Sequence, residues 1–361
     1  MPSTRNLITI FFTFLAFGAR AFGGPAVQIQ ALAEDFVARR DWLDDARFRR
    51  ALGVYQVLPG PEAHEMCCYI GTVRGGRLGG IAAGLGFMLP GLLLMLVASA
   101  LYDAVDLTAA PIAGAMASMQ IAASALILRA SWRLIAPLSY SWLGLVALAA
   151  SVAGLVLATT RADPLLATHA AHATVASPTP LALFGHGLTA GLVTFGGAYT
   201  AIPYVGSVAA GTNGWMTQES CLDGIAIASV LPAPLVIFGT FVGWRGAGLS
   251  GALAFTAGIF LPAFSFTFFG FNFFERLVAW PAARRALDVL SALAIGLVAG
   301  AAIGFAFETT GGYARRPVFF GAWTAPLIAL VVVLLFRTRG RMAVPATVLI
   351  AAALGALLGL R

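Results

Sequence analysis

Phe22-Gly23-Gly24 occurs early in the chain, and Phe195-Gly196-Gly197 repeats it 173 residues further on. A second motif, Leu58-Pro59-Gly60-Pro61, returns as Leu231-Pro232-Ala233-Pro234 at the same offset. Glycine pairs and Pro-x-Pro interrupt helices, because glycine stabilises a helix poorly and proline cannot donate a backbone hydrogen bond. The chain therefore consists of two related halves with helix breaks at matching positions.

The composition places both halves in a lipid bilayer. Of 361 residues, 60% are hydrophobic and only 10% charged, whereas a soluble domain carries about 25% charged residues. The net charge of +7 comes from 22 basic residues, all of them arginine. Arginines in the short loops of a membrane protein mark topology, so we expect no nucleic-acid partner. We interpret the absence of lysine as the bias of a GC-rich bacterial genome, and we expect the bacterial inner membrane.

The apolar runs predict an all-α integral membrane protein with about 10–12 transmembrane or half-membrane helices, several of them broken. Residues 1–160 form a first membrane repeat, residues 161–180 a linker and residues 181–361 a second repeat. The expected segments span residues 7–30, 31–50, 51–72, 78–102, 109–129, 134–159, 181–209, 221–243, 248–274, 286–307, 317–336 and 342–360.

Two of these segments have alternative interpretations. Residues 7–30 imitate a signal peptide, but we expect them to be retained, because residues 181–194 precede the second Phe-Gly-Gly in the same way. Segment 134–159 is either one span or a hairpin of two short helices, since Pro137 blurs its start.

Loop charge predicts the orientation of the halves. Cytoplasmic loops are rich in arginine, and Asp103 and Asp106, with no nearby arginine, mark an outside loop. Segments 78–102 and 248–274 then cross in opposite directions, so the halves form inverted repeats, with parallel repeats as the alternative. If the first two membrane segments both crossed fully, the arginines of residues 39–50 would lie outside, against this rule. A re-entrant segment at the first Pro-Gly-Pro would keep them inside. The arginines that we assign to the cytoplasm are Arg129, Arg133, Arg276, Arg284, Arg285, Arg337, Arg339 and Arg341.

Helix breaks at matching depth in two membrane halves indicate the substrate site of a transporter. A half-helix that starts after a break presents unpaired N–H groups and a positive dipole end, which suit an anion. The alternative is that the glycines only allow close helix packing. We expect substrate contacts from Gly23, Gly24, Pro25, Gln28, Pro59, Gly60, Pro61, Gly196, Gly197, Tyr199, Pro232, Pro234 and Arg20. Arg20 either binds an oxyanion in a bidentate manner or extends to the membrane interface.

Only the first Pro-x-Pro is followed by titratable side chains, namely Glu62, His64 and Glu65. Acidic and histidine side chains in a membrane usually mark ion or proton pathways. We expect Glu62 or Glu65 to carry a coupling proton, with His64 as the second candidate. Alternatively, Glu62 only caps its half-helix and Glu65 pairs with an arginine. His186 and Asp223 are further intramembrane candidates with weaker context.

Nothing in the sequence indicates a cofactor. Cys67 and Cys68 are adjacent and lack the spacing of a metal site, so we expect a structural role for them and no metal. There is no dinucleotide fingerprint and no catalytic constellation of nucleophile and base. A membrane-embedded reductase is therefore a weaker alternative to a transporter. A channel is weaker because inverted repeats with an acidic patch that can carry protons argue for coupled transport.

The sequence resembles the chromate ion transporter family in its long, two-domain form. The first half carries "AFGGPAVQIQALAEDFVARRDWL", "LPGPEAHEMCCYIG" and "GGIAAGLGFMLPG". The second half carries "TFGGAYTAIPYVGSVAAGTNGWM", "APLVIFGTFVGW" and "GIFLPAF", which are similar to the second copy of that family's domain. The resemblance implies secondary active export of chromate, with sulfate as a look-alike, driven by protons or by the membrane potential.

Two features of the second half depart from that family's pattern. Pro232-Ala233-Pro234 replaces the usual Pro-Gly-Pro, and Ala228-Ser229-Val230 replaces more polar residues. Both changes alter one wall of the expected site, so transport of another oxyanion such as sulfate remains an alternative. The expected partners are the oxyanion, protons and the lipid bilayer, and the sequence leaves a homo-oligomer open.

Overall fold

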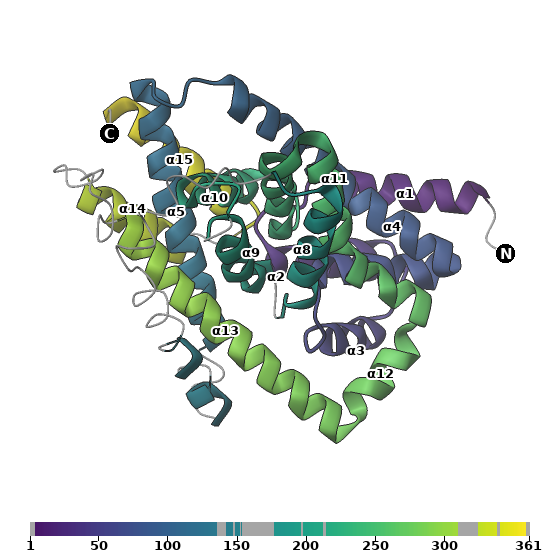
Figure 1. The fold of residues 1–361 in the computed structure, drawn as a ribbon. Helices are drawn as coiled ribbons and strands as arrows, with labels where there is room; N and C mark the ends of the chain where they lie inside the picture. The colour runs from purple at the N-terminus through teal and green to yellow at the C-terminus, as the bar shows by residue number, and fades with distance from the viewer. Residues whose placement is uncertain are drawn as a thin grey trace.

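The computed structural model describes residues 4–135, 142–146, 149–151, 153, 177–195, 198–211, 214–309, 324–337 and 340–358. Every regular element in these ranges is a helix (Figure 1), which confirms the all-α class. Most of the expected span 134–159, most of the linker, and the glycines Gly196 and Gly197 lie outside the described residues.

The first half begins with a helix that is interrupted at its glycine pair. α1 spans Thr4–Gly18 and α2 spans Pro25–Leu32. Between them, Gly23 and Gly24 have φ angles of 97° and 83°, in the left-handed region that other residues rarely enter. Pro25 is the first residue of α2, where its missing N–H costs no hydrogen bond. The predicted break in segment 7–30 is therefore confirmed.

The second predicted break, at Pro59-Gly60-Pro61, is confirmed as well. α2 continues into the π-helix η1 (Ala33–Arg39), and α3 (Asp45–Tyr55) follows after a short turn. α3 ends before the proline motif, and α4 (Glu62–Ala104) starts directly after it. Proline is well suited to this position because it cannot continue a helix from the preceding residues.

α4 is a hairpin of two helical arms. Gly75 and Gly76 leave helical geometry, with φ angles of −139° and 61°, and they separate residues 62–74 from residues 77–104. The arms touch at Gly71, whose α-carbon lies so close to the backbone of Gly79 that a side chain there would collide. Small residues at helix contacts let two backbones approach closely in a membrane.

The second half packs in the same way. α8 (Pro180–Leu192) lies along α11 (Phe238–Phe269), as α1 lies along α4. α11 also turns back on itself, at Ala247 and Gly248, and its two arms meet at Gly243 and Gly251. These glycines follow their counterparts in α4 by 172 residues.

The contact between each first helix and its hairpin recurs too. Gly18 of α1 lies against the backbone of Phe87 in α4, and Gly191 of α8 lies against the backbone of Ile259 in α11. The two glycines are 173 residues apart, and the two residues that they touch are 172 apart. The helix contacts of the two halves are therefore separated by nearly the same number of residues as the repeated sequence motifs.

The other helices surround these two units. α5 packs against α10, α13, α14 and α15, and α13 is the long light-green helix along the lower edge of Figure 1. Their bounds are α5 (Ala110–Ile135), η2 (Ala198–Thr200), α9 (Ala201–Ala209), α10 (Gln218–Val230), η3 (Leu235–Ile237), α12 (Phe271–Ala279), α13 (Pro281–Thr309), α14 (Thr324–Arg337) and α15 (Ala343–Leu358).

In the second half, the predicted break at Pro232-Ala233-Pro234 is confirmed, and one predicted segment is shorter in the structure. Segment 221–243 is divided at Leu231–Pro234, where α10 ends before η3 and α11 begin. Segment 248–274 is corrected, because α11 ends at Phe269 and Gly270, with a φ of 82°, starts a separate helix α12. Left-handed geometry at a glycine ends a helix at low cost, and the periodicity of the apolar residues does not reveal it.

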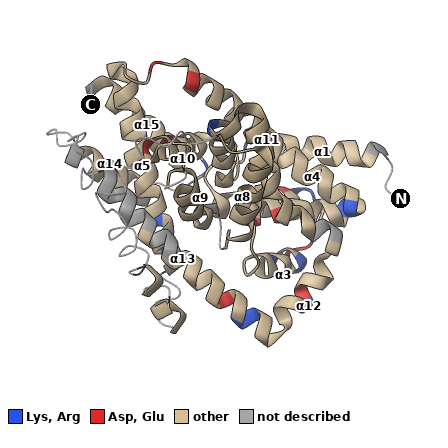
Figure 2. Ribbon diagram, in the orientation of Figure 1, with Lys and Arg blue, Asp and Glu red and all other residues tan. Residues whose placement is uncertain are grey.

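The surface of the helices suits lipid. Three helical stretches among the described residues are long and apolar enough to cross a membrane, namely Glu62–Ala104, Ala110–Ala130 and Leu235–Ser265. Large apolar side chains such as Leu94, Val97 and Leu101 are exposed. Charged residues lie mostly near helix ends and in connecting segments (Figure 2).

The structure adds an ion pair to the charges that we used to predict orientation, and it corrects the expected position of two arginines. Asp103 has no arginine near it in the sequence, yet it forms an ion pair with Arg245 of the second half. Arg129 and Arg133 belong to α5, which continues to Ile135, and not to a loop. The ion pair could not be read from the sequence because its partners are far apart in the chain, whereas the position of the two arginines depends on where α5 ends.

Candidate functional site

The break at Gly23-Gly24-Pro25 opens onto a cavity of about 900 Å³. Walls of this cavity come from α2, the start of α4, the end of α5, η2, α13 and α15. The first break thus faces a cavity that elements of both halves of the chain surround.

One wall of the cavity is the first turn of α2. Gly23, Gly24 and Pro25 line it, together with Ala26 and Val27. No side chain caps α2 at Gly24. The N–H groups of a helix's first turn have no partner within the helix, and they carry the positive end of its dipole. A bare helix end facing a cavity is a suitable place for an anion.

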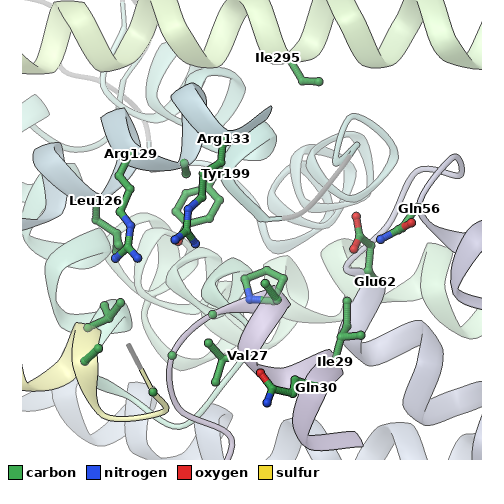
Figure 3. Close-up of a pocket in the computed structure, with 18 of the residues that line it drawn as sticks. Val27, Ile29, Gln30, Gln56, Glu62, Leu126, Arg129, Arg133, Tyr199 and Ile295 are labelled. Carbon is green, nitrogen blue, oxygen red and sulfur yellow. The ribbon is translucent and has the colours of Figure 1, made fainter. Parts of the chain in front are cut away.

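The opposite wall carries two arginines. Arg129 and Arg133 lie one turn apart on α5, where Leu126 and Ala130 complete the same lining face. Arg129 is only 9% exposed. Figure 3 shows the two guanidinium side chains beside each other at the cavity. Guanidinium groups can donate two parallel hydrogen bonds to an oxyanion, so this wall is suited to a tetrahedral anion.

Both arginines were missed as site residues, because the sequence analysis assigned them to a cytoplasmic loop. The usable signal was their spacing. Leu126, Arg129, Ala130 and Arg133 follow the i, i+3, i+4, i+7 pattern of one helical face. Arginines on such a face near the end of an apolar segment are candidates for a polar interior site.

Tyr199 lies between the two walls. It belongs to η2, directly after the second Phe-Gly-Gly, and its hydroxyl faces Gly24. Figure 3 shows the tyrosine ring next to Arg133. The predicted site residues Gly23, Gly24, Pro25 and Tyr199 therefore come together at one cavity, although they derive from both halves of the chain.

Glu62 is the carboxylate of the cavity. It is the first residue of α4, it is 7% exposed, and it lies across the cavity from the arginines with Gln56 beside it (Figure 3). The cavity therefore has two cationic side chains on one side and one acidic side chain on the other. A bound anion and an ionised Glu62 would repel each other.

Glu65 lies near the cavity but does not line it. Its side chain is completely buried, and it packs against the α-carbon of Gly60 at the first Pro-Gly-Pro. Neither of its carboxyl oxygens has a hydrogen-bond partner among the described residues. Burying an unpaired carboxylate is costly, so this group is suited to exchange a proton.

His64 faces away from both glutamates, as its place on the helix predicts. The ring is fully buried between Phe260 and Phe264, 4.9 Å from each ring centre. One ring nitrogen lies 3.2 Å from the carbonyl oxygen of Gly84, and the other lies 3.7 Å from the sulfur of Cys68. These contacts give His64 a place in the core between α4 and α11, outside the cavity lining.

The breaks of the two halves are joined by hydrogen bonds. The N–H of Gly60 donates to the carbonyl oxygen of Thr194, at 2.6 Å, next to the second Phe-Gly-Gly. In the other direction, the buried amide of Gln28 donates to the carbonyl oxygens of Ala21 and Ala233, at 2.7 and 3.0 Å. Gln28 is therefore a bridge between the first glycine break and the second proline break.

The prolines of both motifs shape the backbone rather than the cavity wall. Pro59, Pro61, Pro232 and Pro234 do not line the large cavity. A small extension of about 10 Å³ reaches toward the second proline motif and is lined by Ser229, Leu231 and Ala233 among others.

Arg20 is exposed and lies outside the cavity. Its Nε donates to the carbonyl oxygen of Ala16, and its guanidinium lies 3.8 Å from the carboxylate of Asp35. Asp35 also binds Arg39, at 3.2 Å. This position agrees with the alternative interpretation of Arg20 as a residue that extends to the surface.

Two other intramembrane candidates lie in the second half. His186 lies 3.2 Å from the hydroxyl of Tyr204 and stacks near Trp215. Asp223 is buried and accepts hydrogen bonds from Tyr102 and Gln120. Neither His186 nor Asp223 lines the cavity.

The cysteines offer no alternative chemistry at this site. Cys67, Cys68 and Cys221 form no disulfide, and all three are buried and do not line the cavity. Within the described ranges, no group of three or more histidine, cysteine or acidic residues is arranged to hold a metal ion.

Comparison with known proteins identifies the family. The model of the chromate transporter family matches this chain twice, over residues 8–176 and 181–360. A chromate transport protein of Pseudomonas aeruginosa is 39% identical, over 96% of this chain and 94% of its own length. A chromate transport protein of Cupriavidus metallidurans is 28% identical over 83% of this chain, and a probable chromate transport protein of Synechococcus elongatus is 27% identical over 80%.

No solved structure matches the chain. The two family matches meet at the linker predicted from the sequence, and together they cover nearly the whole protein. The chain belongs to the chromate transporter family, which is a family of membrane transporters and not of enzymes.

Proposed function

We propose that this protein is a secondary active transporter that exports chromate across the bacterial inner membrane. The names of its relatives support chromate as the substrate. The observation that carries the proposal is the cavity of about 900 Å³ between the first turn of α2 and the arginines of α5. Its helix end and its two guanidinium groups are the donors that a tetrahedral dianion needs.

Charge balance favours a divalent anion in this cavity. When Glu62 is protonated, Arg129 and Arg133 leave two positive charges in the cavity, which match the two negative charges of chromate. Sulfate has the same charge and shape, and the donors on these walls make no distinction between the two ions. We therefore expect sulfate to compete with chromate, and sulfate transport is the second candidate function.

Proton coupling is proposed for the glutamates of α4. Glu62 has the best position, because its carboxylate and the anion share one cavity. Glu65 is the second candidate, because its buried carboxyl group touches the break that contacts the other half of the chain. The aromatic surroundings of His64 favour a structural role for that residue.

Alternating access is proposed to occur between the two halves. Matching helix contacts at an offset of 172–173 residues support a repeat, and inverted repeats with a site at their interface are common in secondary transporters. Opposite orientation of the halves in the membrane is part of this proposal.

Everted membrane vesicles test the proposal, because their cytoplasmic face is outside. We expect radioactive chromate to accumulate in vesicles that contain the protein when the interior is made acidic or electrically positive. Excess sulfate should lower the uptake. Flux that only follows the electrochemical gradient of chromate itself, with no response to a pH gradient at zero membrane potential, would favour a channel. Recovery of reduced chromium would favour a reductase.

A further inference from the structure

Asp223 is a second buried carboxyl group, well away from the cavity. It lies on α10 of the second half and is only 4% exposed. Its Oδ2 accepts a hydrogen bond from the hydroxyl of Tyr102 on α4, at 2.7 Å, and its Oδ1 accepts one from the amide of Gln120 on α5, at 2.8 Å. The carboxyl group therefore connects three helices, and one of them belongs to the hairpin of the first half.

The donors that hold Asp223 are neutral. No arginine pairs with it within the described part of the chain, since Arg245 lies over the ring of Tyr102 and pairs with Asp103 instead. The nearest other acid is Glu219, one turn earlier on the same helix and exposed. An ionised carboxylate without a cation is costly inside a membrane, and binding a proton removes that cost.

The other packed helices add no charge next to Asp223. α15 contains no ionisable residue. α9 contributes only Tyr204, whose hydroxyl is occupied by His186. The titratable and charged neighbours of Asp223 are thus Tyr102, Asp103 and Arg245 from the other helices and Glu219 from its own.

A row of hydroxyl groups connects Asp223 with the surface. The hydroxyl of Tyr102 lies 3.3 Å from Oγ of Ser220, and this oxygen lies 3.1 Å from Oγ1 of Thr217. Thr217 is the exposed N-cap residue of α10. A hydroxyl group can donate one hydrogen bond and accept others, so each of these three groups can receive a proton on one side and release one on the other.

We propose that Asp223 is a proton-binding site, loaded from the molecular surface through the hydroxyl groups of Thr217, Ser220 and Tyr102. Tyr102 gives its proton to Oδ2 of Asp223 and receives the proton of Ser220. Ser220 receives the proton of Thr217, which takes one from water. One proton enters at the surface, one arrives at the carboxylate, and each hydroxyl group ends with the single proton that it had before.

This site lies at a contact between the two halves of the chain. The carboxylate of Asp223 accepts a hydrogen bond from Tyr102 of the first half. Protonation turns one acceptor position of this carboxylate into a donor. Binding of a proton therefore changes the connection between α4 and α10. The further step, that this change is used in transport, rests on the proposed function.

Infrared difference spectroscopy of the purified protein tests the proton site without chromate. We expect a change from high to low pH to produce the carbonyl band of a protonated, buried carboxylic acid. Glu62 and Glu65 are also buried and can contribute to this band. The component that belongs to Asp223 should disappear in Asp223→Asn and shift in Asp223→Glu, which keeps a carboxyl group. Glu219→Gln removes the same charge one turn away and should leave the band unchanged. A full band in Asp223→Asn would overturn the proposal.

The relay is tested by the rate at which the band appears after a pH jump. Tyr102→Phe and Ser220→Ala interrupt the row of hydroxyl groups, so the band should reach its full height more slowly. Ser220→Thr keeps a hydroxyl group and should restore the wild-type rate. Equal rates in all variants would overturn the path. Both infrared measurements are made without chromate. They therefore test the proton site even if the protein proves not to transport chromate.

Discussion

Arg129 and Arg133 lie one helical turn apart on α5, opposite the first turn of α2. Their residue type was visible in the sequence, but their environment depended on where α5 ends and on what packs around it. The helix break at Gly23, Gly24 and Pro25 was predicted correctly, because glycine and proline act locally on the backbone. A side chain that gains its role from a distant helix gives no comparable local signal.

The pH dependence of anion binding should come from Glu62. A proton on this side chain removes the negative charge that faces the bound anion, so affinity should rise as pH falls. In Glu62→Gln this dependence should be lost, and affinity should stay at the level of the protonated form. The affinity of purified protein for chromate, measured over a range of pH, tests this prediction. If Glu62→Gln has the same pH profile as the wild type, Glu62 is not the group whose protonation affects anion binding.

Tight glycine contacts determine the shape of the helical hairpins. Gly71 and Gly79 in α4 have the same relationship as Gly243 and Gly251 in α11. The breaks at the glycine and proline motifs could be predicted from the sequence, as could the division between residues 51–72 and 78–102. The separate helix α12 could not, because a single left-handed residue, Gly270, ends α11 within an apolar run.

Substitution of a contact glycine should destabilise its hairpin. Gly71→Ala places a methyl group against the backbone of Gly79, and such overpacking typically costs about 1–3 kcal/mol. Gly53→Ala is the matched control, because open space surrounds this residue in α3 and alanine there should stabilise the helix by about 0.5–1 kcal/mol. Thermal unfolding in detergent compares the two. Equal stability of both variants would show that the contact has no energetic importance.

The two halves meet at their breaks. Gly60 bonds directly to Thr194, whereas Ala21 and Ala233 are joined through the amide of Gln28. The sequence predicted the matching positions of these breaks but not their contacts, since only the assembled fold brings residues more than 130 positions apart together. The same reason explains why the pair of Asp103 and Arg245 was not predicted.

Loss of the Gln28 bridge should weaken the contact between the halves. Gln28→Ala leaves two carbonyl oxygens without their donor, and we expect a loss of about 1–2 kcal/mol in the free energy of unfolding. Gln30→Ala on the same helix is the control. Its amide bonds only to the nearby Glu34, so a change within about 0.5 kcal/mol is expected. An equal loss in both variants would contradict the role of the bridge.

The central claim is that the oxyanion binds between α2 and the arginines of α5, and equilibrium binding of radioactive chromate tests it most directly. Loss of a charged hydrogen-bond donor typically costs about 1.5–3 kcal/mol, so Arg129→Gln and Arg133→Gln should each weaken binding by about tenfold or more. Lysine at either position should restore part of the affinity. Arg284→Gln removes an exposed arginine of α13 outside the cavity and should bind like the wild type. Wild-type affinity in both cavity variants, in protein that remains folded, would contradict the account.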